Sequence, residues 1–334
     1  MKKLSLLIIG LLFVPTLFFT SCDRGDDLIV DGEASVPTFT ILKNYMVDNS
    51  LDINKIITSD AGQKFVVGAP AVADYDAAAY KAKYYIMDIR SAAKYAESHI
   101  DGAVNVAFGD ILTESAKAGS KTILMVCYTG QTACYATALL RMYGYTDTQA
   151  LKWGMTGWSS TTDSWTGKVG NVGSTSANWS FNAAPDVNIF DEPVLNSLSV
   201  DGGDILRKRV EQAVADGFKT ASNTDVVGTP SDYFINNYFS DADFTGFGHI
   251  TGSHKILPLT LAGNEYKNLD ASAKIVTYCY TGQTSAVVTA CLNVLGYDAY
   301  SLTFGMNGLN HSSSQWSSNQ WGVDSKTKNL PLVN

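Results

Sequence analysis

The chain has 334 residues, of which 46% are hydrophobic and 17% charged, a composition typical of a folded globular protein and not of a disordered one. That length is enough for two domains of ordinary size. The formal net charge of −8 argues against nucleic acid as a partner, because nucleic-acid binding needs a basic surface to neutralise phosphates.

The N-terminal segment has the layout of a secretory signal. Lys2 and Lys3 precede an apolar run, LSLLIIGLLFVPTLFF, which is short for a membrane span and ends in small polar residues. We therefore expect a signal peptide at residues 1–21. The string FTSC resembles a bacterial lipobox, which implies cleavage before Cys22 and lipidation of its thiol. The alternative is a plain signal peptide with an incidental cysteine.

An acidic, turn-rich stretch, CDRGDDLIVDGEAS, follows the signal, and we expect a tether at residues 22–40. Acidic residues directly after a lipidated cysteine resemble the surface-export signals of some Gram-negative lipoproteins. We therefore expect a lipid-anchored protein in the cell envelope of a Gram-negative bacterium, on the periplasmic face or the cell surface. It would touch the membrane through the lipid alone, because no other stretch is long and apolar enough to span a bilayer.

Most of the remaining chain is an internal duplication. The string CYTGQT occurs at residues 127–132 and again at 279–284, and LKWGMTGW, which begins at Leu151, matches LTFGMNGL, which begins at Leu302. His99 and His249 open the matching strings HIDGA and HITGS. The duplication predicts a domain in each half, joined by a linker. The expected bounds are residues 41–165 for the first domain, 166–195 for the linker and 196–334 for the second domain.

Each copy alternates strands and helices along the chain. In the first copy, YYIMDI, GAVNVAF, KTILMV and TQALKW predict short strands, SAAKYAESH predicts a helical turn, and ACYATALLRMYGY predicts a helix that stops at Gly144. In the second copy, KIVTY predicts a strand and SAVVTACLNVLGY a helix that ends at Gly296. This alternation is typical of an α/β fold, with an open, mostly parallel sheet in each copy and helices on both of its faces.

Each repeated loop begins with a cysteine at the end of an apolar strand. Because a helix starts about five residues later, backbone N–H groups and the positive helix end would face whatever Cys127 or Cys279 carries. Such a setting stabilises a thiolate and can lower its pKa from about 8.5 to roughly 3.5–7.5. The candidate residues that would hold the bound group are Tyr128, Thr129, Gly130, Gln131 and Thr132 in the first copy and Tyr280, Thr281, Gly282, Gln283 and Thr284 in the second.

The motifs together resemble a known family. The pattern C-x-x-G-x-T ahead of a helix, a D-x-R at Asp88 and Arg90, the HIDGA string and the GMTGW string look like a rhodanese domain. Two copies in tandem resemble the thiosulfate and 3-mercaptopyruvate sulfurtransferases, over roughly residues 60–165 and 205–320.

The resemblance implies a sulfurtransferase. Cys127 or Cys279 would take a sulfane sulfur from a small donor (thiosulfate, mercaptopyruvate or polysulfide), hold it as a persulfide and pass it to a thiol or to cyanide. Asp88 and Arg90 would support the loop. No phosphate loop or dinucleotide fingerprint occurs, so no cofactor is expected, and the absence of C-x-x-C and H-x-x-x-H spacings argues against a metal site.

The second copy departs from the family pattern. Asn237 and Phe239 stand opposite Asp88 and Arg90, and the loops themselves do not rank the two cysteines. Neither loop contains Arg or Lys, which argues against doubly charged thiosulfate as the donor. Cys134 and Cys291 fall in predicted helices and are expected to be buried structural thiols.

Two other functions are alternatives to sulfur transfer. A cysteine phosphatase would need an Arg six positions after the cysteine, where Ala133 and Ser285 stand, so this chemistry is not expected. A non-catalytic rhodanese-fold binding or scaffold lipoprotein of the cell envelope stays open. His99 and His249 have no second base beside them in the sequence, so a structural hydrogen bond is the preferred interpretation of each.

Overall fold

The computed structural model describes residues 36–334. The signal peptide predicted at 1–21, the lipidation of Cys22 and most of the tether predicted at 22–40 lie outside the described residues. Within the described part, no helix combines the length and the apolar character that a membrane crossing requires.

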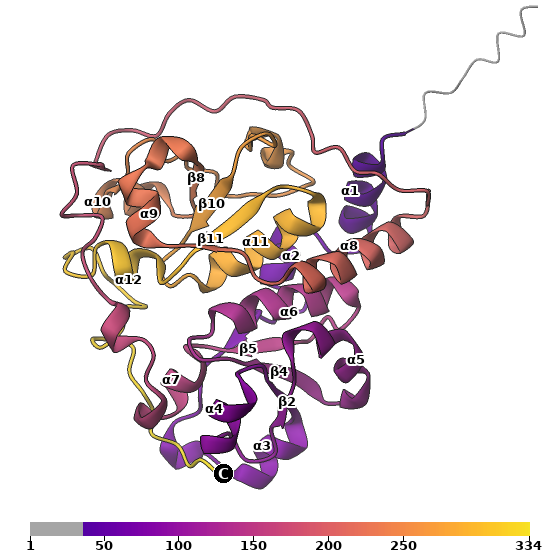
Figure 1. The fold of residues 1–334 in the computed structure, drawn as a ribbon, viewed down its shortest axis with the longest axis vertical. Coiled ribbons are helices and arrows are strands. Elements are labelled where there is room, and N and C mark those ends of the chain that lie inside the picture. Colours follow the sequence, from indigo (N-terminus) through magenta and orange to yellow (C-terminus); the bar gives the residue numbers. More distant parts are fainter. Residues whose placement is uncertain (1–35) are drawn as a thin grey trace, which may run out of the picture. The chain divides into compact units, whose positions relative to one another are not determined.

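The first repeat is built on a five-stranded parallel sheet in the order β1-β5-β4-β2-β3. Its strands are β1 (Val66–Val67), β2 (Tyr84–Asp88), β3 (Val104–Asn105), β4 (Thr122–Val126) and β5 (Gln149–Leu151). The helices of this part of the chain are α1 (Thr38–Asp48), α2 (Ile53–Ile57), α3 (Ala77–Lys83), α4 (Ala92–Glu97), α5 (Ile111–Ser115), α6 (Gln131–Tyr143) and α7 (Gly154–Trp158). Figure 1 shows α3, α4, α5, α6 and α7 around the sheet, and α1 and α2 beside the helices of the second repeat.

Alternate residues of β4 face two different cores, as a strand with both faces covered requires. Ile123 and Met125 lie in one buried cluster, together with residues of α6. Leu124 and Val126 lie in a second cluster with Trp158 of α7. The sheet is therefore covered on both faces.

The second repeat contains a four-stranded parallel sheet in the order β7-β11-β10-β8. Its strands are β7 (Thr220–Ala221), β8 (Phe234–Asn237), β10 (Ile275–Tyr278) and β11 (Ala299–Leu302), and β6 (Trp179–Ser180) pairs with β9 (His249–Ile250) in a separate antiparallel ladder. Its helices are α8 (Gly202–Asp216), α9 (Asn223–Gly228), α10 (Asp241–Phe247), α11 (Gln283–Leu295) and α12 (Gly305–Leu309). The two parallel sheets and their helices confirm the predicted fold class.

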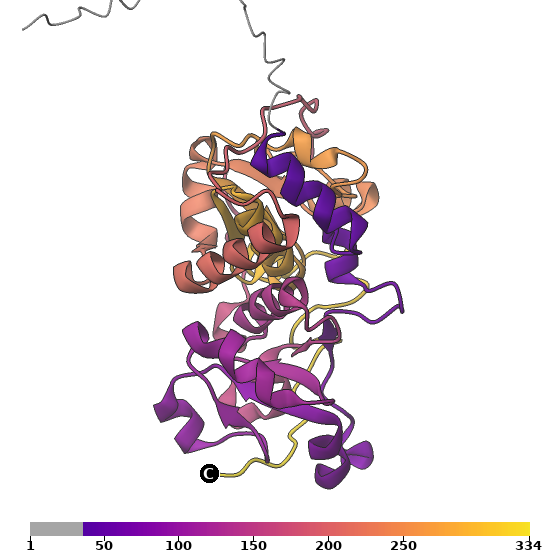
Figure 2. The ribbon, with the colours of Figure 1, turned by 90° about the vertical axis from the view of Figure 1, so that its right-hand side faces the viewer.

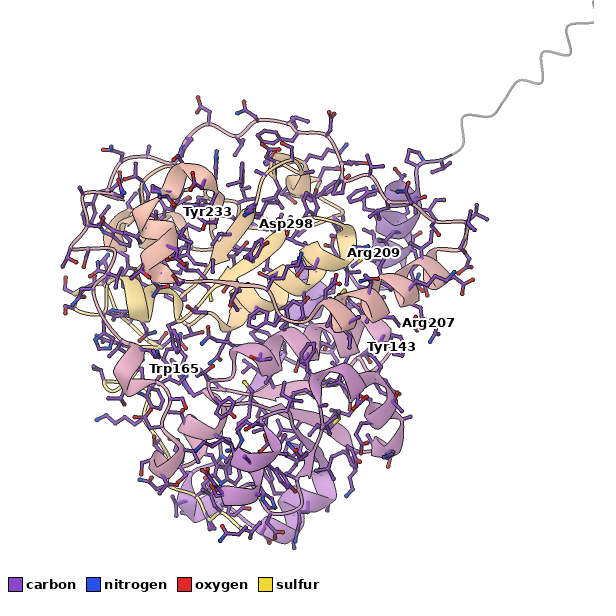
Figure 3. All side chains as sticks on the ribbon, in the orientation of Figure 1. Tyr143, Trp165, Arg207, Arg209, Tyr233 and Asp298 are labelled. Atoms are coloured by element: carbon purple, nitrogen blue, oxygen red, sulfur yellow. The ribbon has the colours of Figure 1, made fainter. Side chains whose placement is uncertain are left out.

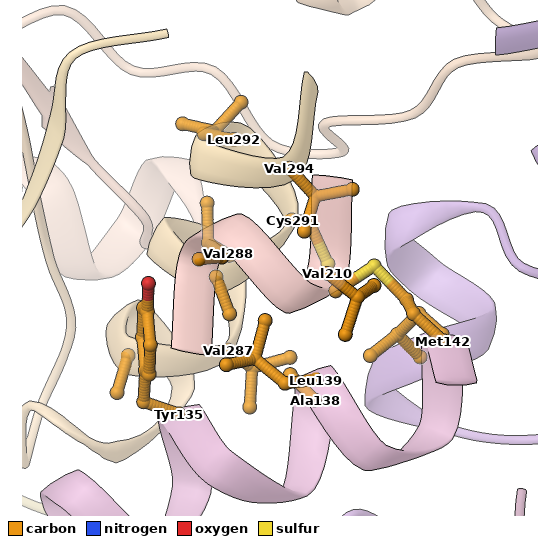
Figure 4. Close-up of a cluster of buried hydrophobic side chains, with 14 of the residues drawn as sticks. Tyr135, Ala138, Leu139, Met142, Val210, Val287, Val288, Cys291, Leu292 and Val294 are labelled. Carbon is orange, nitrogen blue, oxygen red and sulfur yellow. The ribbon is translucent and has the colours of Figure 1, made fainter. Parts of the chain in front are cut away.

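One buried cluster joins the two repeats. Helix α6 of the first repeat packs on α11 of the second, and α8 packs on both. Figure 4 shows side chains of these three helices interleaved, and Figure 2 shows α6 and the second repeat's helices side by side from a direction at right angles to Figure 1. At the edge of this packing, the Arg207 guanidinium lies over the Tyr143 ring, 5.1 Å from its centroid (Figure 3). The two helices that follow the CYTGQT loops therefore share one core.

The first helix of the described residues and the C-terminal segment each pack on the other repeat. The ring of Phe39 in α1 lies 5.6 Å from that of Tyr266 in the second repeat. At the other end, the backbone of Val333 bonds to that of His99, and the Trp158 indole N–H donates to the Pro331 carbonyl at 2.9 Å. Figure 1 accordingly shows the C-terminus beside the first repeat. The domain bounds expected at 41–165, 166–195 and 196–334 stay predictions, since segments from both ends cross between the halves.

Candidate active site

The first loop holds the Cys127 sulfur against backbone donors. Cys127 follows β4, and Gly130 adopts a left-handed conformation with φ +86° at the start of α6, which glycine adopts without a Cβ penalty. The sulfur accepts hydrogen bonds from the N–H groups of Gly130 at 3.1 Å and Ala133 at 3.3 Å. The thiol is only 3% exposed.

The second loop repeats this geometry around Cys279. Gly282 has φ +75° at the start of α11, and the Ser285 N–H donates to the Cys279 sulfur at 3.4 Å. The Cys279 sulfur also lies 3.6 Å from the Ser285 hydroxyl oxygen. This thiol is 2% exposed. Both sulfurs thus lie at a helix N-terminus, as the sequence predicts.

The strings GMTGW in the first repeat and GMNGL in the second form a hydrogen bond to the cysteine backbone of each loop. In the first repeat, the N–H of Met155 donates to the Cys127 carbonyl at 2.9 Å. A Cβ on Gly154, whose φ is +58°, would overlap that same carbonyl oxygen. In the second repeat, Met306 donates to the Cys279 carbonyl at 2.9 Å. The glycine before each methionine is what lets α7 and α12 approach the loops this closely.

Burial dominates the electrostatics of Cys127. Its removal from water raises the pKa of the Cys127 thiol, and the nearby Asp88 carboxylate raises it further. The N–H groups of Ala133, Thr129 and Gly130 act in the opposite direction and offset this only in part. The expectation of a thiol pKa below its usual value is therefore wrong for Cys127, because desolvation outweighs the backbone donors.

Asp88 and Arg90 form a buried ion pair beside the first loop. The Arg90 Nε and Nη2 atoms donate to the Asp88 carboxylate at 2.6–3.0 Å, and both side chains are buried. Nη2 also donates to the Ser98 carbonyl at 2.7 Å. The guanidinium carbon lies 5.9 Å from the centroid of the Tyr128 ring. The pair thus adjoins the loop through Tyr128, which is compatible with the supporting role that the resemblance implies.

The second repeat fills the same places with uncharged groups. The Asn237 amide donates to the Tyr278 hydroxyl at 2.8 Å. Phe239 stacks on Tyr280, with ring centroids 4.3 Å apart and an interplanar angle of 23°. The Tyr280 hydroxyl donates to the Asp243 carboxylate. An aromatic stack therefore takes the place of the guanidinium beside the loop tyrosine.

The two loops contact each other, which sequence analysis did not predict. The Gln131 side-chain oxygen accepts from the Phe304 N–H at 2.9 Å. The Gln283 side-chain nitrogen donates to the Thr129 carbonyl at 3.3 Å, and Trp165, labelled in Figure 3, donates to the same carbonyl at 3.0 Å. Gln131 and Gln283, which occupy the same position in the two loops, therefore each form a hydrogen bond between the repeats.

Cys279 lines a cavity of about 380 Å³ between the second loop and the first repeat. The loop contributes Cys279, Tyr280, Thr281, Gln283 and Thr284. The other lining residues are Ile57, Thr58, Lys64, Phe65, Val66 and Lys152 of the first repeat and Asn319 near the C-terminus. Thr284, a candidate for holding the bound group, thus lines this cavity, and no side chain caps α6 or α11.

Two lysines give this cavity positive charge. Lys64 and Lys152 take part in none of the salt bridges of the described residues. Burial lowers the pKa of Lys152, the neighbouring Lys64 lowers it further, and Asp324 opposes both effects. The Lys152 ammonium donates to the Asn319 side-chain oxygen at 2.7 Å. Both lysines come from the first repeat, whereas neither loop contains Arg or Lys.

The remaining candidate residues have structural contacts. His99 stacks on Tyr95 with centroids 3.9 Å apart, and a ring nitrogen bonds to the Tyr95 carbonyl at 2.9 Å. His249 bonds to the Phe244 carbonyl at 3.3 Å in the same way.

The four cysteines of the described residues are unpaired and buried. Among the described residues, no group of three or more His, Cys, Asp or Glu side chains is arranged to hold a metal ion.

Comparison with known proteins identifies the two halves. The family model described as "Rhodanese-like domain" matches residues 72–161 and 237–312. A search of curated proteins returns no match.

Several solved structures show low similarity to the chain. Thiosulfate sulfurtransferase from Pseudomonas aeruginosa is 14% identical with a TM-score of 0.29, over 90% of this chain and 49% of that one, so the chain spans about half of that enzyme. 3-Mercaptopyruvate sulfurtransferase from Leishmania major is 13% identical with a TM-score of 0.27, over 74% and 75%. A rhodanese-related protein from Thermoplasma volcanium is 17% identical with a TM-score of 0.25, over 35% and 98%.

The assignment follows from the family match and the duplicated sheets, and not from these loose structural similarities. Each matched range contains one CYTGQT loop and the strand before it. The chain therefore contains two rhodanese-like domains in tandem.

Proposed function

We propose that the protein is a sulfurtransferase in which Cys279 carries a sulfane sulfur as a persulfide. The observation that carries this proposal is the cavity of about 380 Å³ that is lined by Cys279 together with Lys64 and Lys152. The family match supports a sulfur-carrying cysteine in this loop. The loop N–H groups and the N-terminus of α11 favour negative charge on the sulfur or on an atom attached to it.

The chemistry is two displacements at sulfur. The Cys279 thiolate attacks the transferable sulfur of the donor, and a new S–S bond forms. The bond that held this sulfur in the donor breaks with its electron pair leaving on the rest of the donor: an S–S bond and sulfite for thiosulfate, or a C–S bond and pyruvate enolate for mercaptopyruvate. An acceptor such as cyanide or a thiolate then attacks the outer sulfur of the persulfide. The electron pair of the second broken bond returns to Cys279 as thiolate.

The charge of the cavity favours an anionic donor. Lys64 and Lys152 face the same space, and Lys64 lowers the pKa of Lys152, so an anion between them would relieve their mutual repulsion. Thiosulfate and mercaptopyruvate are both anions. The absence of Arg and Lys from the loops thus does not disfavour thiosulfate, because lysines from the other repeat fill that role.

Cys127 is the second candidate. Its sulfur lies in a buried apolar cluster that includes Met125, Ala133 and Ala150. Burial raises the pKa of the Cys127 thiol, which lowers its thiolate fraction at neutral pH. We therefore assign the transfer to Cys279 first.

Intact mass spectrometry tests the proposal. The reduced wild type and the variants Cys127→Ser, Cys279→Ser and the double variant are incubated with thiosulfate or polysulfide, and then with cyanide. We expect one added sulfur atom on the wild type and on Cys127→Ser, removed by cyanide, and none on Cys279→Ser. Folded, reduced protein that takes no cyanide-removable sulfur on either cysteine would overturn the proposal and leave the scaffold alternative.

We also propose that the protein is a lipoprotein of the cell envelope. The support is the sequence of residues 1–35 alone. Metabolic labelling with a tagged fatty acid tests it, with label expected on the wild type and lost in Cys22→Ser. Equal labelling of both proteins, or none on the wild type, would contradict the anchor.

A further inference from the structure

The two loops have the same six residues, yet the next residue differs. Six positions after each cysteine, the helix residue whose N–H donates to the sulfur is Ala133 in the first repeat and Ser285 in the second. Each donates at nearly the same distance, 3.3 and 3.4 Å. At this position the two sites therefore differ by a hydroxyl group, while the Gly130 N–H is an additional backbone donor to the Cys127 sulfur.

The strands behind the two sulfurs also differ, because those of the second repeat carry hydroxyl groups where those of the first repeat carry apolar side chains. In the first repeat, Met125 of β4 pairs with Ala150 of β5. In the second repeat, Thr277 of β10 pairs with Ser301 of β11 at the equivalent register. Two apolar residues of the first repeat are thus replaced by two hydroxyl-bearing residues behind Cys279.

The hydroxyls of Ser285 and Ser301 form a short chain that ends at the Cys279 sulfur. The Cys279 sulfur lies 3.6 Å from the Ser285 oxygen, and the Ser285 oxygen lies 2.8 Å from the Ser301 oxygen. Ser301 in turn reaches the Gly282 carbonyl at 3.4 Å. Ser285 and Ser301 are both fully buried, so water does not compete for these bonds.

Burying hydroxyls is unfavourable unless they find partners. The Thr277 hydroxyl is fully buried and has no partner among the described residues. The first repeat closes the same fold with Met125, Ala133 and Ala150 in a continuous apolar cluster. The hydroxyls behind Cys279 are thus not a requirement of the fold.

We propose that Ser285, held by Ser301, is a positioning residue that stabilises the thiolate of Cys279, and that this hydroxyl pair makes Cys279 more reactive than Cys127. While Cys279 is a thiol, its S–H donates to the Ser285 oxygen. When the proton leaves to solvent through the cavity, the Ser285 hydroxyl turns to donate to the sulfur, and the Ser301 hydroxyl donates to Ser285. The first loop has no hydroxyl in this place.

Other ionisable groups surround both sulfurs and stay the same in the test. Tyr280, Tyr238 and Cys134 interact electrostatically with Cys279, Asp243 binds the Tyr280 hydroxyl, and Lys64 and Lys152 line the cavity. Asp88 and Cys134 are the corresponding neighbours of Cys127. Comparison of variants that keep all of these groups isolates the hydroxyls.

The test is the pH profile of iodoacetamide alkylation, read by peptide mass. In the Cys127→Ser background, we expect Ser285→Ala to slow alkylation of Cys279 about tenfold near neutral pH and to move the midpoint of the profile up by about one pH unit. Ser301→Ala should move it the same way by less. An unchanged midpoint in folded Ser285→Ala, or in Ser301→Ala should the first variant not fold, would overturn the proposal.

The chain provides its own reciprocal control. In the Cys279→Ser background, Ala133→Ser with Ala150→Ser should speed alkylation of Cys127 at neutral pH. This proposal rests on the proposed function only for the use of the Cys279 thiolate in sulfur transfer. Alkylation needs no sulfur donor and therefore tests the reactivity of Cys279 by itself. A protein that alkylates as expected but takes up no sulfur would overturn the sulfur transfer alone.

Discussion

The side-chain oxygen of Gln131, in the loop of the first repeat, accepts a hydrogen bond of 2.9 Å from the backbone N–H of Phe304 in the second. The Gln131 side chain is 4% exposed. Its counterpart Gln283 crosses in the other direction, but as a donor, to the Thr129 carbonyl at 3.3 Å. Identical residues of the two loops therefore make contacts of different kind and length.

This asymmetry predicts different costs for the same substitution. Gln131→Ala leaves the Phe304 N–H without its partner, and we expect it to lower the free energy of unfolding by about 1–3 kcal/mol. Gln283→Ala should cost less than about 1 kcal/mol, because the Thr129 carbonyl keeps the Trp165 indole donor. Denaturant unfolding of both variants measures the difference, and equal losses would contradict the asymmetry.

The lysines of the cavity predict a charge-dependent donor preference. Lys152→Met and Lys64→Met should each raise the KM for thiosulfate, by about tenfold for Lys152, which corresponds to about 1.4 kcal/mol. The difference in KM between each variant and the wild type should shrink as ionic strength rises, because salt screens the lysine–anion attraction in the wild type. Steady-state kinetics at two salt concentrations measures both effects.

The matched control is Lys328→Met. Lys328 lines a neighbouring cavity with Lys152 but not the one at Cys279, so its loss should leave the KM unchanged. An uncharged dialkyl trisulfide should be used equally well by all four proteins. A KM for thiosulfate that is the same in Lys152→Met as in the wild type would show that the lysine does not contact the donor.

Sequence patterns predicted the local structure well and the contacts between the repeats poorly. The strands before Cys127 and Cys279, the helices that end at Gly144 and Gly296, and the glycine φ values of both loops follow from short-range periodicity and turn chemistry. Lys64 could not be found in this way. It lies over two hundred residues from Cys279 in the chain, and only the packing of the repeats brings it into the same cavity.

The wrong expectation for the pKa of the Cys127 thiol also has a physical reason. A loop of backbone donors at a helix start predicts a lowered thiol pKa, and the donors are present at the predicted places. The sequence does not show how deeply the sulfur is buried, and burial decides the direction here. The shared core of α6 and α11, which also buries Cys134 and Cys291, arises from contacts between halves that neither half reveals alone.

Because Asp88 and Arg90 form a buried ion pair, we predict that the effects of substituting the two residues on the free energy of unfolding are not additive. Arg90→Phe alone leaves the Asp88 carboxylate buried without its partner, and we expect it to lower the free energy of unfolding by about 3–5 kcal/mol. Adding Asp88→Asn gives the first repeat the uncharged residues that stand at these positions in the second, Asn237 and Phe239, and should recover part of that loss. Denaturant unfolding of the two single variants and the double variant measures the coupling.

Two outcomes distinguish the explanations for that pair. Recovery in the double variant would show that the buried charge, and not the shape of Arg90, causes the loss. A double variant as unstable as the sum of the single ones would contradict this, and would mean that the Arg90 contact with the Ser98 carbonyl carries the stability.

The buried thiols predict that the protein loses stability in mild alkali. Burial raises the pKa of Cys134 and of Cys291 in the folded protein, whereas an unfolded cysteine has a pKa of about 8.5. Above that pH the unfolded chain releases thiol protons that the folded chain retains, so the stabilising contribution present below pH 8.5 declines as the pH rises. Each thiol should remove about 1 kcal/mol of unfolding free energy between about pH 8 and 9.5.

Variants that lack these two thiols isolate the effect from every other titrating group. Cys134→Ala with Cys291→Ala will be less stable than the wild type at all pH values, because the missing sulfurs leave small cavities in the core shared by α6 and α11. The change in unfolding free energy between about pH 8 and 9.5 should nevertheless be smaller by about 2 kcal/mol than in the wild type, both under reducing conditions. Parallel pH profiles for the two proteins would show that the folded chain releases these protons as readily as the unfolded one.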